Sequence, residues 1–185
     1  MLLTELVGIV DGHSATEAAE SIKRDCQRFI QEWGGIPTPD HAIYRGMTNS
    51  WPNFAYQTKA IRTPTGMNIN TQHRLDDYFQ EEFGHRYRSE NMLFGTGNPN
   101  HTEMFGSIHI VFPIGNYSYL WSPEVNDLNF LLISKSVEEI IATTHFIHNK
   151  SLNKILDHEV MINVKKYYAI PIKVYKRSVY PLLIE

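Results

Sequence analysis

The sequence contains a single cysteine, Cys26, and its 185 residues carry a formal net charge of only -3 at pH 7. A lone cysteine excludes an internal disulfide, and the helical pattern around Cys26 favours a packed thiol over a nucleophile. The small charge shows no bias toward phosphate backbones, so the composition gives no support to a nucleic-acid-binding protein. We therefore expect chemistry that does not depend on this cysteine.

Long hydrophobic runs are also missing, and none approaches the ~20 apolar residues that a membrane-spanning helix needs. The first residues, MLLTELVGIVDGHS, lack the basic start and the longer apolar stretch of a secretory signal. The sequence has no low-complexity tract, no block of like charges and no internal repeat. We therefore expect a cytoplasmic protein with no membrane partner, whose function depends on local groups of residues.

The length and composition fit one globular domain. A chain of 185 residues can bury a full hydrophobic core but is short for two domains of ordinary size. The hydrophobic fraction of 42% and the charged fraction of 20% are typical of globular proteins. We treat residues 1–185 as a single domain.

The first part of the sequence predicts helices. Ser14 and Glu17 have the spacing of a capping box, and apolar residues follow at intervals of three and four. This pattern predicts a helix over residues 14–33 that packs its apolar stripe on a sheet. A second helix is predicted from residue 70 or 71 to about residue 83, where a glycine follows.

The later part of the sequence predicts mainly strands. Ser136 and Glu139 form another capping-box pattern, which predicts a helix to about residue 148, and PNHTEMFG predicts a short helical turn. The polar segment 47–67 is expected to be a loop that covers a ligand. Strand composition is found in HAIYRGM, ENMLFGTGN, SIHIVFPIG, NYSYLWSP, HEVMINV and YYAIPIKVYKR. Helices first and strands later favour an α+β fold over a repeating βαβ layout.

Arg45 interrupts an otherwise apolar strand pattern, IYRG. A buried guanidinium is costly unless it meets an anion, and its planar fork of donors suits carboxylate or phosphate oxygens. From the residues alone, Arg45 either binds an anionic ligand or pairs with an acidic side chain at the edge of the sheet.

Asp157 and Glu159 lie two residues apart in DHEVMI. In a strand this spacing places both carboxylates on the same face, so both are expected to point into one cleft. One carboxylate can then stabilise a cationic transition state while the other acts as a polar or basic group. The alternative is an ordinary solvated strand face.

Thr96 lies between two glycines in the segment Phe94-Gly95-Thr96-Gly97-Asn98. The missing side chains of Gly95 and Gly97 allow a ligand or another backbone to approach closely, and the Thr96 hydroxyl can hold a carboxylate. The alternative is a strand-to-helix turn in which Asn98 caps the next helical turn.

In this order the three segments resemble the arginine, serine-threonine-serine, glutamate signature of the cholera-toxin-like mono-ADP-ribosyltransferases. The family's arginine commonly lies in a sequence like Tyr44-Arg45-Gly46, and its glutamate runs directly into an apolar strand, as Glu159 does. The resemblance covers residues 14–177. The length of the chain is also similar to that of small ADP-ribosyltransferases made by some tailed phages.

Two parts of the sequence depart from the family pattern. Gly95 and Gly97 occupy the positions of the two serines, so Thr96 is the one hydroxyl left in the middle motif. Asp157 occupies the position of a glutamate or glutamine that helps to select the acceptor, and a carboxylate there resembles the arginine-modifying members of the family.

The resemblance implies a fold and a reaction. The implied fold is an α+β, ADP-ribosyltransferase-like split β-sandwich with an N-terminal helix and short flanking helices. The implied reaction consumes NAD as a substrate, releases nicotinamide through an oxocarbenium-like transition state and transfers ADP-ribose to a macromolecule. A protein is the expected acceptor, with an arginine of a host protein as one candidate, and a nucleic-acid acceptor stays open. A phage origin would place the protein in the host cytoplasm.

The resemblance also implies roles for individual residues. Glu159 would stabilise the cationic transition state, Asp157 would orient or deprotonate the acceptor, and Thr96 would fix the Glu159 rotamer. Arg45 would bind the pyrophosphate or the adjacent ribose. The segments expected to bind the cofactor also contain Tyr44, Gly46, Gly95 and Gly97.

The residues also allow three other interpretations. A domain of the same fold that has lost turnover could serve as a binding or virion structural protein. An NAD glycohydrolase would use the same residues with water as the acceptor. His145, His148 and His158 could approach one another, but no HExxH or CxxC spacing accompanies them, so no metal is expected.

Overall fold

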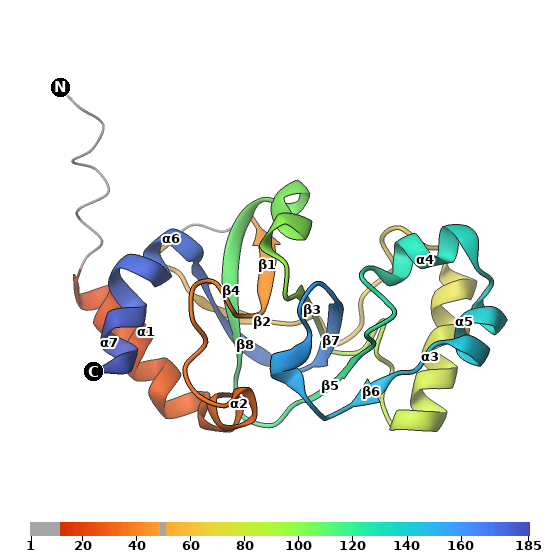
Figure 1. Cartoon of the computed structure of the whole chain (residues 1–185), viewed down its shortest axis with the longest axis horizontal. Coiled ribbons are helices and arrows are strands. Elements are labelled where there is room, and N and C mark those ends of the chain that lie inside the picture. The colour runs from red at the N-terminus through yellow and green to blue at the C-terminus, as the bar shows by residue number, and fades with distance from the viewer. Residues whose placement is uncertain (1–11, 49–50) are drawn as a thin grey trace.

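The computed structural model describes residues 12–48 and 51–185, and the first eleven residues of the sequence therefore lie outside the account that follows (Figure 1). The elements in chain order are α1 (Gly12–Asp25), α2 (Gln27–Trp33), β1 (Tyr44–Met47), β2 (Ala55–Gln57), α3 (Ile69–Phe83), β3 (Met92–Thr96), η1 (Pro99–Phe105), β4 (Ser107–Pro113), β5 (Ser118–Trp121), α4 (Leu128–Ser134), α5 (Val137–Thr143), β6 (Ile147–His148), η2 (Leu152–Lys154), β7 (Glu159–Asn163), β8 (Lys166–Pro171), α6 (Ile172–Val174), η3 (Tyr175–Val179) and α7 (Tyr180–Ile184). This order confirms the expected α+β class.

The strands of the described residues form one eight-stranded antiparallel sheet in the order β2-β8-β4-β1-β3-β7-β5-β6. The joint between β1 and β3 is narrow, because only Tyr44 and Thr96 are paired across it. By contrast, β1 pairs with β4 over the whole of Tyr44–Met47, and β3 pairs with β7 over the whole of Met92–Thr96. The sheet therefore consists of two four-stranded halves that meet at a single residue pair.

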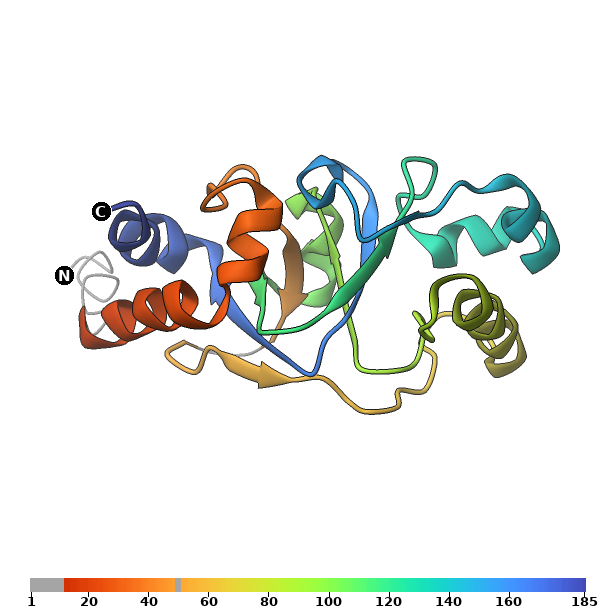
Figure 2. The same cartoon turned by 90° about the horizontal axis from the view of Figure 1, so that it is seen from below.

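The helices lie at the two ends of the molecule, and the buried side chains form two hydrophobic cores. Figures 1 and 2 show α1, α6 and α7 at one end of the molecule and α3, α4 and α5 at the other. The larger core includes Phe29 of α2, Phe112 of β4 and Tyr175 of η3. The smaller core includes Phe79 of α3 and Leu120 of β5. The larger core also includes Tyr44 of β1, Leu93 of β3 and Val160 of β7, so it extends across the joint between β1 and β3.

The predicted helix over residues 14–33 is wrong in its start and in its continuity. Helix α1 already includes Gly12, so Ser14 lies inside the helix and does not cap it. Cys26 leaves the helical conformation, with φ -112° and ψ 24°, and separates α1 from α2. Cys26 is buried, as the packed-thiol interpretation expected. Gly34 ends α2 in the left-handed conformation, with φ 90°, which glycine adopts without steric cost.

The two later helices keep their predicted starts within a residue or two. Helix α3 is capped by Asn68, whose side chain accepts a hydrogen bond from the Thr71 amide at 2.8 Å. Helix α5 has the predicted capping box, with reciprocal hydrogen bonds between Ser136 and Glu139. The prediction that this helix continues to residue 148 is wrong, because α5 ends at Thr143 and strand β6 follows.

Two helical regions were not predicted. Helix α4 lies in the segment after NYSYLWSP, and the strand predicted for YYAIPIKVYKR stops at Pro171, where α6, η3 and α7 begin. The buried side chains of this end recur every four residues, at Tyr175, Val179 and Leu183, which is a helical period. Among the described residues, no helix combines the length and apolar character needed to cross a bilayer.

Candidate functional site

The three segments of the sequence signature meet at the joint of the sheet. Arg45 lies on β1, Thr96 ends β3 and Glu159 begins β7, and these strands are neighbours in the order β1-β3-β7. Thr96 pairs with Tyr44 on one side and with Glu159 on the other. Residues that are far apart in the sequence are therefore collected on adjacent strands (Figure 1).

The Glu159 carboxylate is held by two groups that the sequence analysis did not identify. Its Oε1 accepts a hydrogen bond from Arg88 Nη1 at 2.5 Å, and its Oε2 accepts one from the Leu128 amide at 2.8 Å. The Thr96 hydroxyl accepts a hydrogen bond from the Asn98 amide at 3.1 Å, and no hydrogen bond joins it to Glu159 among the described residues. In this structure Arg88 and Leu128 fill the orienting role that was expected of Thr96.

Arg88 is a residue of the candidate site that sequence reasoning missed. Its side chain is 5% exposed, against 14% for Glu159, so the ion pair between them is largely shielded from water. Its Nη2 also donates to Asn129 Oδ1 at 3.1 Å, and its guanidinium lies 4.7 Å from the centroid of the Phe94 ring. The segment before β3 is short and polar and reads as a surface turn in the sequence, whereas Tyr87, Arg88 and Ser89 are all buried in the structure.

Arg45 has no acidic partner among the described residues. Its Nη1 donates to the Phe94 carbonyl oxygen at 2.8 Å, and its Nε is buried without a hydrogen bond. Burial lowers the pKa of the Arg45 guanidinium, because the charged form loses its hydration. The alternative of an acidic pair at the sheet edge is wrong, since β1 lies inside the sheet between β4 and β3.

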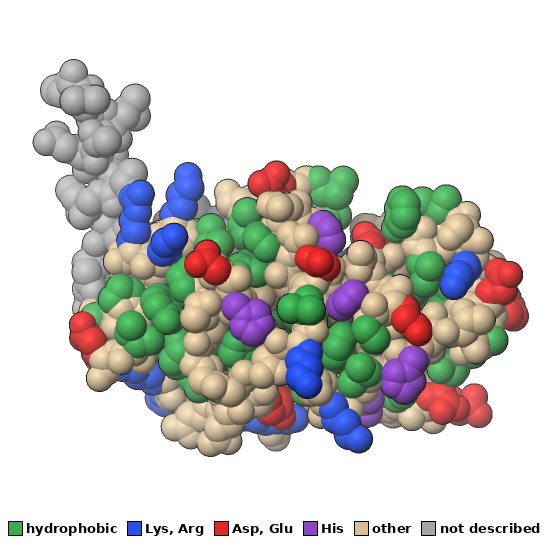
Figure 3. Space-filling model, in the orientation of Figure 1, with side chains coloured by type: hydrophobic (Ala, Val, Ile, Leu, Met, Phe, Trp, Pro, Cys, Tyr) green, Lys and Arg blue, Asp and Glu red, His purple; other side chains and the backbone are tan. Residues whose placement is uncertain are grey.

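Arg62 adds a third guanidinium from the segment predicted to cover a ligand. It lies 4.5 Å from the centroid of the Phe94 ring and donates to Thr65 Oγ1 at 2.9 Å. Burial lowers its pKa, and the positive charges of Arg88 and Arg45 lower it further, whereas Glu159 raises it. Three arginines and one carboxylate therefore share this site, which leaves it with an excess of positive charge. On the face of the molecule shown in Figure 3, acidic and basic side chains are interspersed.

The glycines of the signature lie against the protein's own chain. A Cβ at Gly97 would lie 1.8 Å from the Leu156 carbonyl oxygen, and one at Gly46 would lie 2.2 Å from a main-chain oxygen of η1. A Cβ at Gly95 would lie 2.4 Å from an isoleucine side chain that precedes β1. The close approach that these glycines permit is therefore taken by the fold itself. The cofactor contact expected at their Cα atoms has no room there.

Tyr44, the residue before Arg45 on β1, is part of the larger hydrophobic core. Its side chain is fully buried, and its hydroxyl donates to the Pro39 carbonyl oxygen at 2.9 Å. Burial raises the pKa of the Tyr44 hydroxyl to about 12. Tyr44 therefore fixes β1 to the chain before it, and the contact with a cofactor expected of Tyr44 would require this buried ring to move.

Asp157 does not share a strand with Glu159. Strand β7 begins at Glu159, and Asp157 lies exposed in the preceding turn, so the prediction that both carboxylates lie on one strand face is wrong. Asp157 Oδ1 accepts a hydrogen bond from Asn98 Nδ2 at 2.9 Å, which ties this turn to the end of β3. Asp157 is thus close to the middle motif and open to a macromolecular partner.

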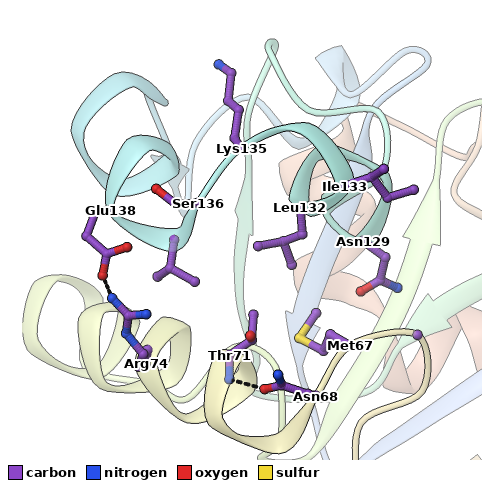
Figure 4. A pocket seen from close by; sticks show the side chains of 12 residues that line it. Met67, Asn68, Thr71, Arg74, Asn129, Leu132, Ile133, Lys135, Ser136 and Glu138 are labelled. Atoms are coloured by element: carbon purple, nitrogen blue, oxygen red, sulfur yellow. Dashed lines mark hydrogen bonds and ion pairs between the residues drawn. The ribbon is translucent and has the colours of Figure 1, made fainter.

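A cavity of about 340 Å³ lies beside this site, between the start of α3 and the helices α4 and α5 (Figure 4). Met67 and Leu132 point toward one another across it, and an ion pair between Arg74 and Glu138 lies at its side. Asn129 lines the cavity and also accepts the hydrogen bond from Arg88. The cavity is therefore next to the ion pair between Arg88 and Glu159. The volume falls in the range of small-molecule sites.

Two of the three histidines considered as metal ligands have ring nitrogens close to other polar groups. His148 Nε2 lies 3.0 Å from the Tyr87 hydroxyl, and His158 Nδ1 lies 2.8 Å from Asn126 Oδ1. Within residues 12–48 and 51–185, no three His, Cys, Asp or Glu side chains are grouped in a way that could hold a metal ion.

No protein-family model, no curated protein and no solved structure matches this chain. The function must therefore be argued from the residues and geometry described above.

Proposed function

We propose that this protein is a mono-ADP-ribosyltransferase, which cleaves NAD and transfers ADP-ribose to a macromolecular acceptor. The observation that carries the proposal is the adjacency of β1, β3 and β7, which bear Arg45, Thr96 and Glu159 in the order of the family signature. The division of the sheet into two halves joined at one residue pair supports the finer assignment, a split β-sandwich of the ADP-ribosyltransferase type.

The residues at the joint have the charges that this reaction needs. Loss of nicotinamide leaves positive charge on the ribose, and a preorganised carboxylate at Glu159 would stabilise that charge as it develops. The diphosphate of NAD carries negative charge, which the guanidinium groups of Arg45, Arg62 and Arg88 would neutralise. Removing the Glu159 charge is expected to slow the reaction by about a hundredfold or more, as for other preorganised electrostatic groups.

The acceptor would approach from the turn that contains Asp157. This side chain is exposed and is tied to the end of β3 through Asn98, so it lies at the outer side of the site. In the proposed reaction Asp157 orients or deprotonates the acceptor group as it attacks the ribose. A protein acceptor is the working assumption, with arginine as the candidate side chain, and a nucleic-acid acceptor is the alternative for the same step.

The test is nicotinamide release from NAD by the purified protein, with and without cell lysate. Glu159→Gln removes the charge with almost no change in shape, and Glu81→Gln removes an exposed carboxylate on α3 as the matched control. We expect release that falls about a hundredfold or more in Glu159→Gln and is unchanged in Glu81→Gln. Full activity of a correctly folded Glu159→Gln variant would contradict the proposed mechanism.

One observation favours a second candidate, a binding or virion structural domain without turnover. Each oxygen of Glu159 already accepts a hydrogen bond, from Arg88 and from the Leu128 amide, and the Arg88 guanidinium compensates the carboxylate charge that a cationic ribose would need. A folded protein that releases no nicotinamide under any condition would favour this candidate. An NAD glycohydrolase is separated by labelled NAD, because its ADP-ribose would appear free in solution and not on a macromolecule.

A further inference from the structure

The positive charge around Phe94 is only partly neutralised. Arg88 is paired with Glu159, whereas Arg45 and Arg62 have no ion-pair partner in the part of the chain that the structure describes. The Nε donor of Arg45 is buried and makes no hydrogen bond. Buried donors and charges of this kind are costly unless an anion meets them, so the site is built for more negative charge than Glu159 supplies.

The three arginines converge on one residue. The guanidinium groups of Arg62 and Arg88 lie 4.5 and 4.7 Å from the centroid of the Phe94 ring, and Arg45 Nη1 lies 2.8 Å from the Phe94 carbonyl oxygen. Guanidinium groups bind phosphate oxygens in pairs of hydrogen bonds, and several of them around one point suit an anion with several oxygens. A diphosphate has the charge and the number of acceptors to use all three.

The space between two of these arginines is too small for such a ligand as the side chains now lie. A gap of about 10 Å³ is lined by Arg62 and Arg88, together with Met67 and Gln72, and it has room for one water molecule. Arg88 lines this gap while its Nη1 donates to Glu159. A diphosphate in contact with all three guanidinium groups needs more space than this gap provides, and movement of the Arg88 side chain away from Glu159 would supply it.

We propose that Arg88 exchanges partners, pairing with Glu159 in the free protein and with a bound diphosphate, alongside Arg45 and Arg62, in the complex. The exchange uncovers Oε1 of Glu159 at the moment when an anion arrives. The inference rests on the proposed function for the identity of the natural ligand, NAD, whose diphosphate would release the carboxylate that its ribose needs. Arg88 then acts as a positioning residue that keeps Glu159 covered until a substrate with a diphosphate is bound.

The exchange is tested by a double-mutant cycle that measures the binding of inorganic pyrophosphate by calorimetry, with no turnover involved. The proteins compared are the wild type, Glu159→Gln, Arg88→Gln and the double variant. Because Glu159 competes with the ligand for Arg88, we expect Glu159→Gln to bind pyrophosphate about tenfold more tightly than the wild type, the size of one charge-assisted hydrogen bond. In the Arg88→Gln background the same change is expected to alter the dissociation constant by less than about twofold.

Two results would overturn the exchange. If Glu159→Gln tightens pyrophosphate binding by the same factor with and without Arg88, the carboxylate weakens binding by charge repulsion alone and does not compete with the ligand for Arg88. If the wild type does not bind millimolar pyrophosphate at all, the arginines do not form a diphosphate site.

A second pair of variants covers the case in which Arg88→Gln folds poorly, because it leaves a buried carboxylate without its partner. Arg62→Gln removes a guanidinium that has no carboxylate partner, and it is expected to weaken pyrophosphate binding about tenfold. Arg24→Gln, at an exposed arginine of α1 at the other end of the molecule from α3, is the control and is expected to leave binding unchanged. Equal binding by Arg62→Gln and the wild type would also overturn the site.

The outcome is separate from that of the proposed enzyme activity. A protein that shows the coupling between Arg88 and Glu159 but releases no nicotinamide has the exchange without the reaction. A protein that releases nicotinamide but shows no coupling has the reaction without the exchange, and the inference is then wrong.

Discussion

Replacing Gly97 by alanine adds one methyl group at the position where the family signature has a serine. The new Cβ would lie 1.8 Å from the carbonyl oxygen of Leu156 and 2.6 Å from its carbonyl carbon. An ordinary contact between carbon and oxygen is about 3.3–3.6 Å, so the turn before β7 would have to move by about 1.5 Å. The obstacle is main chain, which cannot rotate away as a side chain can.

The expected effect on stability follows from this overlap. Overpacking of this kind lowers the free energy of unfolding by about 1–3 kcal/mol, and for a chain of this size that lowers the melting temperature by about 2–12 °C. Because the displaced turn leads directly into Glu159, we also expect nicotinamide release to fall by tenfold or more, since a shift of ~1 Å in a catalytic group can reduce the rate by about a hundredfold.

Gly84→Ala is the matched control for Gly97→Ala. Gly84 has φ +81° with no atom within 4 Å of a new Cβ, so alanine there introduces backbone strain but no clash. We expect a loss of about 1–2 kcal/mol in the free energy of unfolding and no loss of activity. Thermal unfolding followed by circular dichroism and the nicotinamide assay separate the two variants. Wild-type stability and activity in Gly97→Ala would refute the close contact between Gly97 and Leu156.

Two further predictions concern buried titratable groups. Burial raises the pKa of Cys26 to about 12, so the thiol should resist a thiol-specific reagent near pH 8 until the protein is unfolded, and rapid labelling of the folded protein would contradict its position. Burial lowers the pKa of His109 below its ordinary value of 6.5, so the unfolded chain binds more protons in acid and stability falls as the pH drops below about 6.5. His109→Gln should reduce the fall in melting temperature between pH 7.5 and 5.5, and an unchanged pH dependence would show that another group causes it.

The parts of the fold that were predicted correctly depend on local signals. The capping box of Ser136 and Glu139 acts within one helical turn, and the glycine at position 84 ends α3 through its own backbone conformation. The end of the chain was mispredicted because its tyrosines and valines favour strands when they are read singly. There the tertiary packing decides, since Tyr175 and Val179 become buried on one face of a helical segment.

The site was predictable only where a family pattern supplied the long-range information. Arg45, Thr96 and Glu159 were expected to act together, and the sheet does place their strands side by side. Arg88 was not expected, because its pairing with Glu159 joins residues that are 71 positions apart and depends on how the segment after α3 folds back. The spacing of residues in a single sequence does not predict a long-range ion pair of this kind.

The departures of this sequence from the family signature are connected by the geometry of the joint. A serine side chain does not fit at position 97, because the Leu156 main chain occupies the space beside the Gly97 Cα atom. At position 95 the side chain of Ile43 occupies the corresponding space. In the signature that the sequence resembles, two serine hydroxyls occupy these positions, whereas here Arg88 and the Leu128 amide donate to the two oxygens of Glu159. An orienting group with a positive charge differs from a hydroxyl in one respect, because an anionic ligand can compete for it. In the proposed enzyme the tighter packing around the glycines and the ion pair would therefore make the exposure of Glu159 depend on the substrate.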